Sequence, residues 1–183
     1  MTYMKSVFKS FHTLFFSLQL LTIVSLTGCV VLPIEHDNLT ETSLQAINKA
    51  YIQTVKDTLN DPNEHWTSGW LGNMWVNYHE GKQRGLCYQW KYRVHAGVKT
   101  TVLENNWGIS GIVVNEGAKH EHHAVIVYDP VRIKKKDLLT ATRHQPVYIL
   151  DPWRQGQPDI YHVSDWLKLP AKTTVPARLI TAQ

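Results

Sequence analysis

The residues of this sequence that could carry out covalent chemistry are a cysteine, two adjacent histidines and an aspartate. Cys87 follows a glycine-containing turn, the pair His122 and His123 opens an apolar run, and Asp151 ends a second apolar run. A thiol nucleophile needs a base to exchange its proton and a further polar group to orient that base. The order cysteine, histidine, aspartate therefore indicates nucleophilic catalysis by Cys87.

The segment that begins at Cys87 is predicted to be a helix. Apolar residues recur at every fourth position, at Leu86, Trp90, Val94 and Val98, which predicts a helix over about residues 86–99. This prediction places Cys87 in the first turn, where backbone N–H groups lack intrahelical acceptors and the helix dipole favours a thiolate.

The histidines and the aspartate are predicted to lie on strands. Residues 108–114 and 122–128 are apolar runs separated by a turn, which predicts a β-hairpin. Residues 147–150 form a third predicted strand, which ends at Asp151, and 159–163 a fourth. Adjacent strand residues point to opposite faces, so one of His122 and His123 should face the cysteine. Because residues 124–128 are apolar on both faces, the alternation does not decide between them.

An amphipathic helix is predicted before these elements, over residues 41–59. Its apolar side chains fall on one face, at Leu44, Ile47, Tyr51, Val55 and Leu59. Helices in the first half and an antiparallel sheet in the second predict an α+β fold, with the helix that Cys87 opens packed on a small sheet. The 183 residues, 43% of them hydrophobic, suffice for one buried core.

The first 28 residues are predicted to be a cleaved leader. Lys5 and Lys9 precede an apolar stretch from Leu14 to Leu26, which is short for a membrane span. The stretch ends in Leu26-Thr27-Gly28-Cys29, which resembles the lipobox of bacterial lipoproteins. The resemblance implies a signal peptide over residues 1–28, a diacylglyceryl group on Cys29, a tether over 29–37 and a single domain over 38–183. In a Gram-negative bacterium, the same resemblance implies that Val30, in place of aspartate, favours an outer membrane anchor that faces the periplasm.

Charge and cysteine content narrow the possible partners. Residues 1–28 contain two of the 19 basic residues and no acidic ones, so the mature chain has 17 basic and 15 acidic side chains, a net charge of +2. This balance gives no indication of nucleic acid binding. If Cys29 carries lipid, Cys87 is the sole remaining thiol in an oxidising compartment, where a lone cysteine is either a buried apolar residue or a nucleophile.

Three motifs together resemble those of papain-like and transglutaminase-like cysteine enzymes. They are Gly85-Leu86-Cys87 at a helix start, His122-His123-Ala124-Val125 at a strand start and Leu150-Asp151-Pro152-Trp153 at a strand end. The resemblance covers about residues 80–155. The aspartate matches the transglutaminase-like branch better, and the Asp-Cys-Ser-Gly signature of many cell-wall endopeptidases is missing.

The resemblance implies a role for each matched residue. His123 would be the base, because His-Ala-Val follows the family pattern, with His122 as the alternative. Asp151 would orient the base, and Trp153 would shield the pair from water. The second oxyanion donor, beside the Cys87 N–H, would be Gln83 in the papain-like branch. In the transglutaminase-like branch it would be an indole, for which Trp66, Trp70 and Trp75 are candidates.

These observations predict a membrane-anchored thiol hydrolase or acyltransferase of the bacterial cell envelope that acts on amide or peptide bonds without a cofactor. Envelope proteins, secreted peptides and peptidoglycan stem peptides are the substrates within reach of such an anchor. Two other classes of function remain open. One is a metal-binding lipoprotein, in which His120, Glu121, His122 and His123 supply ligands and Cys87 or Asp151 completes the site. The other is a non-catalytic adaptor that keeps the fold.

Overall fold

The structure is a computed structural model that describes residues 31–78, 81–170 and 173–181. The predicted signal peptide and Cys29 lie outside the described residues. Leu32–Gln183 forms one compact unit. No helix within the described ranges is long and apolar enough to cross a membrane.

The fold is α+β, as the sequence predicts. The helices and 3-10 turns are η1 (His36–Asn38), α2 (Thr42–Leu59), α3 (Gly69–Tyr78), α4 (Cys87–Glu104), η2 (Lys135–Thr140) and α5 (Val163–Trp166). The strands are β1 (His65–Trp66), β2 (Gln83–Arg84), β3 (Gly108–Val114), β4 (His122–Tyr128), β5 (Val147–Leu150), β6 (Ile160–His162) and β7 (Arg178–Ile180).

The main sheet has five antiparallel strands in the order β6-β5-β4-β3-β7. The predicted hairpin is present as β3 and β4, with Ile112 opposite Ala124. The predicted third and fourth strands are β5 and β6. The structure adds the edge strand β7 and a separate two-stranded parallel sheet of β1 and β2. These added strands are two or three residues long, which is too short to give an alternating sequence pattern.

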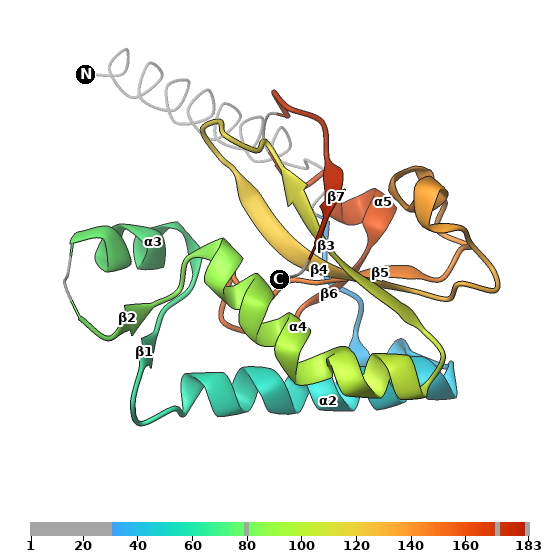
Figure 1. Cartoon of the computed structure of the whole chain (residues 1–183), viewed down its shortest axis with the longest axis horizontal. Helices are drawn as coiled ribbons and strands as arrows, with labels where there is room; N and C mark the ends of the chain where they lie inside the picture. The colour runs from blue at the N-terminus through green and yellow to red at the C-terminus, as the bar shows by residue number, and fades with distance from the viewer. Residues whose placement is uncertain (1–30, 79–80, 171–172, 182–183) are drawn as a thin grey trace, which may run out of the picture. The chain divides into compact units, whose positions relative to one another are not determined.

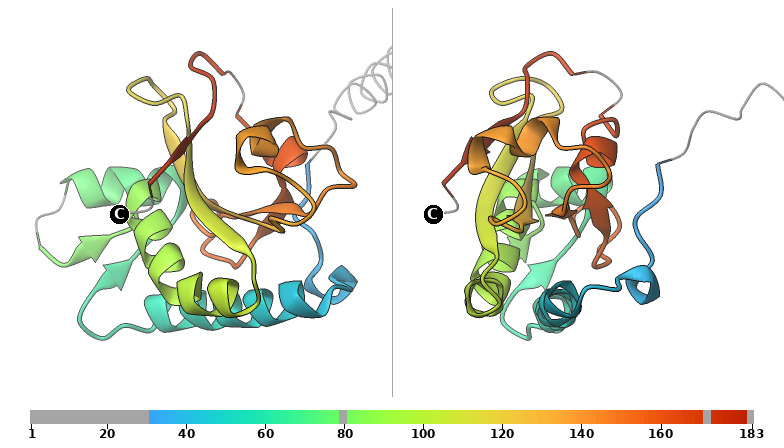
Figure 2. Two further views of the ribbon diagram at one scale, coloured as in Figure 1. Left: turned by 45° about the vertical axis from the view of Figure 1, so that its right-hand side comes forward. Right: turned by 90° about the vertical axis from the view of Figure 1, so that its right-hand side faces the viewer.

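Helices α2 and α4 lie side by side against the sheet (Figure 1), and both are seen nearly end-on in the right-hand view of Figure 2. Their apolar stripes form the core with β4, β5 and β6. The buried members are Leu44, Ile47, Tyr51, Val55, Trp90, Val94, Val98, Val102, Val125, Val127, Leu150 and Ile160. Seven of these are the residues that set the helical period in the sequence. The packing fixes α4 against the sheet and thereby fixes the position of its first residue, Cys87.

The compact unit begins before residue 38. The Ile34 N–H donates to the Ile160 carbonyl at 2.7 Å, and the Ile34 side chain packs against the core. His36 Nδ1 lies 2.8 Å from Asn48 Oδ1. The predicted tether covers residues 29–37, and its second half, which includes Ile34 and His36, therefore contacts the domain.

A candidate Cys-His-Asp site

Cys87 is placed at the helix start by the turn that precedes it. Gly85 has φ +141°, and a Cβ there would lie 2.4 Å from Thr67 Oγ1 and 2.5 Å from the Thr67 carbonyl oxygen. Glycine is therefore required for the chain to pass this close to Thr67. The Gln89 carboxamide oxygen accepts from the N–H groups of Gly85 and Leu86, at 2.9 and 3.0 Å. These contacts hold the chain as it enters α4.

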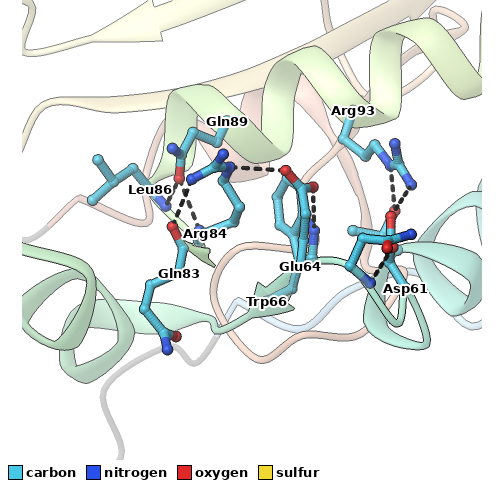
Figure 3. A network of polar contacts seen from close by, with 11 residues as sticks. Asp61, Glu64, Trp66, Gln83, Arg84, Leu86, Gln89 and Arg93 are labelled. Atoms are coloured by element: carbon cyan, nitrogen blue, oxygen red, sulfur yellow. Dashed lines mark hydrogen bonds and ion pairs between the residues drawn. The ribbon is translucent and has the colours of Figure 1, made fainter. Parts of the chain in front are cut away.

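A polar network supports the same turn from below (Figure 3). Glu64 accepts from Arg84 Nε at 3.0 Å and from Trp66 Nε1 at 3.1 Å. The Trp66 ring packs edge-on against Trp90 of α4, with the ring centroids 4.9 Å apart. The short strands β1 and β2 are thus linked to the first two turns of α4.

The histidine that contacts Asp151 is His122. His122 Nε2 lies 2.7 Å from Asp151 Oδ2, and both side chains are buried. The Trp166 indole N–H donates to the same carboxylate oxygen at 2.8 Å. Burial alone would raise the pKa of Asp151, but the charge and hydrogen bond of His122, the charge of Arg154 and the Trp166 N–H together hold it below its ordinary value. The carboxylate is therefore ionised at neutral pH.

Cys87 also contributes to the pKa of the same imidazole, that of His122. Burial lowers the pKa of His122, but the charge of Asp151 and its hydrogen bond, together with the nearby Cys87, outweigh burial and raise the pKa to about 9. Because Nε2 is bonded to Asp151, Nδ1 is the ring nitrogen left for the thiol. Nδ1 is buried and makes no hydrogen bond in the described part of the chain. The Cys87 thiol itself lies 3.8 Å from the Glu121 carbonyl oxygen, to which it donates.

His123, preferred over His122 from the sequence, is not the partner of Asp151. Its Nε2 lies 2.6 Å from Glu121 Oε1, and Glu121 also accepts from the Gly117 N–H at 2.6 Å. Burial, opposed by Glu121 and assisted by the charges of Lys91 and His122, lowers the pKa of His123. The two histidines follow each other in β4 and so point to opposite faces, which lets only one of them reach Asp151. The expected pairing is corrected to His122.

Trp153, the predicted shield of the site, packs against His122. Its ring centroid is 4.6 Å from that of His122, and its indole N–H donates to Asn73 Oδ1 at 2.9 Å. The Trp166 ring stacks on His122 from a second direction, 5.6 Å away. The two indoles cover the imidazole and exclude water from it, which strengthens the ion pair with Asp151.

Two neighbours of Asp151 were not recognised in the sequence. Trp166 supplies the indole N–H described above, and Arg154 Nε lies 3.4 Å from Asp151 Oδ2 without forming a hydrogen bond. Arg154 follows the Asp-Pro-Trp motif directly, so a charge three residues from Asp151 was visible as a signal. Trp166 comes from α5, and its approach to Asp151 depends on tertiary packing alone.

An open groove of about 520 Å³ adjoins the buried cluster. His122 and Trp153 form part of its wall, and the rest is formed by Trp70, Asn73, Met74, Asn77, Lys119, His120, Glu121, Arg154, Leu169 and Pro170. A substrate that enters this groove would reach the imidazole edge of the site. Cys87 is 7% exposed and is not among the residues that line the groove.

The oxyanion donors are only partly defined by the geometry. The Cys87 backbone N–H opens α4, and no described group accepts from it. The Gln83 side chain extends away from the start of α4 (Figure 3), and its carboxamide oxygen is buried without a hydrogen bond. Of the indole candidates, Trp66 already donates to Glu64, and Trp70 lines the groove. The role of Gln83 stays a prediction.

The four consecutive residues from His120 to His123 do not converge on one point. His122 is directed to Asp151, while Glu121 and His123 bind each other. Throughout the described residues there is no group of three or more His, Cys, Asp or Glu side chains arranged to hold a metal ion. The metal-binding alternative therefore has no geometric support in this part of the chain.

The fold and the site together define an α+β domain that carries a buried Cys-His-Asp cluster beside a groove. Comparisons with protein-family models, with curated proteins and with solved structures found no match for this chain.

Proposed function

We propose that the protein is a thiol hydrolase or acyltransferase that acts on amide or peptide bonds, with Cys87 as nucleophile, His122 as base and acid, and Asp151 as the group that orients His122. The observation that carries the proposal is the buried His122 ring, which is bonded to Asp151 through Nε2 and interacts with Cys87, beside an open groove. The cysteine at a helix start and the later histidine and aspartate on strands support a papain-like or transglutaminase-like fold.

The chemistry follows from the protonation states. With a pKa of about 9, the His122 ring holds its proton at neutral pH, so it can stand as an imidazolium beside a Cys87 thiolate. The thiolate attacks the carbonyl carbon, a C–S bond forms, and the C–N bond breaks as Nδ1 gives its proton to the departing amine. Water or an acceptor amine then attacks the thioester carbon and gives a proton to His122. The new C–O or C–N bond replaces the C–S bond, which breaks and returns the Cys87 thiolate. The Cys87 N–H, at the start of α4, would bind the oxyanion.

The proposal includes the envelope location. The lipobox-like motif at Cys29 supports a diacylglyceryl anchor, and an anchored enzyme meets envelope proteins, secreted peptides and peptidoglycan stems. The resolving nucleophile, water or amine, decides between hydrolysis and transfer. No step of this chemistry calls for a cofactor.

The test is the rate at which iodoacetamide alkylates Cys87, followed by mass spectrometry of the Cys87 peptide at pH 6. We expect the wild-type rate to exceed that of a model thiol, because a free thiol is almost wholly protonated at this pH. His122→Ala should lower the rate by about tenfold or more, and the matched control His123→Ala should leave it within about twofold of wild type.

Two results would contradict the assignment. A larger loss from His123→Ala than from His122→Ala would return the base to His123. A wild-type rate equal to that of the model thiol, with no effect of either change, would favour the non-catalytic adaptor.

A further inference from the structure

The groove beside His122 is lined partly by apolar and aromatic side chains and partly by cationic ones. One part is apolar and aromatic, formed by Trp70, Met74, Trp153 and Pro170 among others. Trp70 is 66% exposed, although large apolar rings are usually buried, and such exposure is typical of a surface that a binding partner covers. The volume of about 520 Å³ is within the range of clefts that bind small ligands and short peptides. This part of the groove suits an apolar side chain.

The charged part of the lining is mainly cationic. Lys119 and Arg154 contribute two positive charges, and the charge of the protonated His122 at the wall is balanced by its ion pair with Asp151. Glu121 is the single acidic residue of the lining, and its carboxylate is already bonded to His123 and to the Gly117 N–H. The field in the groove therefore favours an anion.

Arg154 is the cation whose position selects the anion. Its side chain is 26% exposed, and its guanidinium makes no hydrogen bond in the described part of the chain. The nearest carboxylate oxygen, Asp151 Oδ2, is 3.4 Å from Nε and is already bonded to His122 and Trp166. The guanidinium is thus held beside the cluster by charge, and its exposed part is available to a planar carboxylate.

We propose that this groove binds a peptide in which a carboxylate lies next to an apolar side chain, within one or two residues of the bond that is attacked. Arg154 binds the carboxylate, Lys119 supports it with a second charge, and the aromatic wall packs against the apolar side chain. Arg154 acts as a specificity-determining residue. The inference rests on the proposed function, since it names the substrate class of the same site.

The experiment uses small electrophiles that carry or lack the carboxylate. N-chloroacetyl-leucine and N-chloroacetyl-leucinamide share the reactive carbon and the apolar side chain and differ in a single charge. The Cys87 sulfur displaces chloride, so a C–S bond forms as the C–Cl bond breaks. Second-order rates at Cys87 of the full chain are measured at pH 7 by peptide mass spectrometry, with iodoacetamide as the neutral reference. N-chloroacetyl-glutamic acid α-amide, with a side-chain carboxylate, distinguishes an acidic residue from a chain terminus as the source of the charge.

We expect the leucine probe to react about tenfold or more faster than its amide, the factor expected for one charge-assisted hydrogen bond. Arg154→Gln should remove most of this preference, Arg154→Lys should keep part of it, and Arg132→Gln, at an arginine outside the groove, should keep all of it. The ratio of the two probes is the readout, because a general effect of Arg154 on Asp151 would slow iodoacetamide and both probes together.

Equal rates of the two leucine probes on the wild-type protein would overturn the inference, as would a preference that Arg154→Gln leaves unchanged. Failure of the proposed function gives a different result. In that case iodoacetamide reacts at the model-thiol rate and His122→Ala has no effect, whatever the ratio of the probes.

Discussion

The buried His122–Asp151 pair should make the stability of the protein depend on pH in a defined window. The pKa of His122 rises from the ordinary 6.5 to about 9 on folding. A raised pKa means that the folded state binds the proton more tightly, so the contribution to stability is complete below pH 6.5 and is lost as the pH rises through 9. One pKa unit corresponds to about 1.4 kcal/mol, so the loss across this window is about 3 kcal/mol.

The measurement is urea unfolding of the wild-type protein and of His122→Gln at intervals from pH 6 to pH 9.5. The difference between the two free energies of unfolding isolates the histidine from other groups that titrate in the range, and it should shrink by about 3 kcal/mol as the pH rises. His123→Gln is the matched control, because its pKa is lowered and it should show no such fall. Cys87→Ala should lower the pKa of His122 in the folded protein, since Cys87 contributes to its raised value. The pH range over which stability is lost should therefore become narrower.

A difference between wild type and His122→Gln that stays constant from pH 6.5 to 9.5 would refute the reasoning. It would mean that His122 is not held as a cation in the folded protein. At the acid end the sign reverses, because the pKa of Asp151 is lowered. Its contribution is present above the ordinary pKa of a carboxyl and is lost as the pH falls through the lowered value.

Three further changes test the neighbours of the cluster. Gly85→Ala should lower the free energy of unfolding by about 1–3 kcal/mol, measured in urea, whereas Gly81→Ala, with a similar positive φ but open space around it, should cost less. Trp166→Phe removes the indole N–H from Asp151 and should cost about 1.5–3 kcal/mol while slowing iodoacetamide; an unchanged rate would show that this hydrogen bond does not position the base. Lys91→Met should leave the free energy of unfolding unchanged or raise it, because the residue is buried, burial lowers the pKa of its ammonium, and the ammonium lies over the Tyr92 ring; a marked loss of stability would indicate that the charge of Cys87, which acts to raise the pKa of Lys91, makes a stabilising pair with it.

The sequence was sufficient for the helices and the long strands because their patterns are local. The apolar stripe of α4 could be counted residue by residue, and it put Cys87 at a helix start. Asp151 was found because a buried strand ends there. Short strands such as β7 carry too few residues for a pattern, and their existence depends on β3 being available as a partner.

The identity of the histidine could not be obtained from alternation, because β4 is apolar on both faces. All five residues that follow the histidines in β4 are buried, so neither face is marked as polar. The family pattern favoured His123, and it was wrong about the contact with Asp151. Trp166 was missed for a related reason: a tryptophan in a short helix gives no sign, in sequence, that its N–H will reach a carboxylate fifteen residues away.

The two adjacent histidines differ in charge because their environments differ, and this difference assigns their chemistry. His122 is buried against a carboxylate that is itself buried, so the ring is held as a cation, whereas the burial and cationic neighbours of His123 outweigh its contact with the more exposed Glu121. When environments push the pKa values of neighbouring groups apart, each group has a separate role. On the proposed mechanism, the proton needed by a leaving amine is therefore stored on His122. The neutral His123 does not compete for it and does not repel the imidazolium.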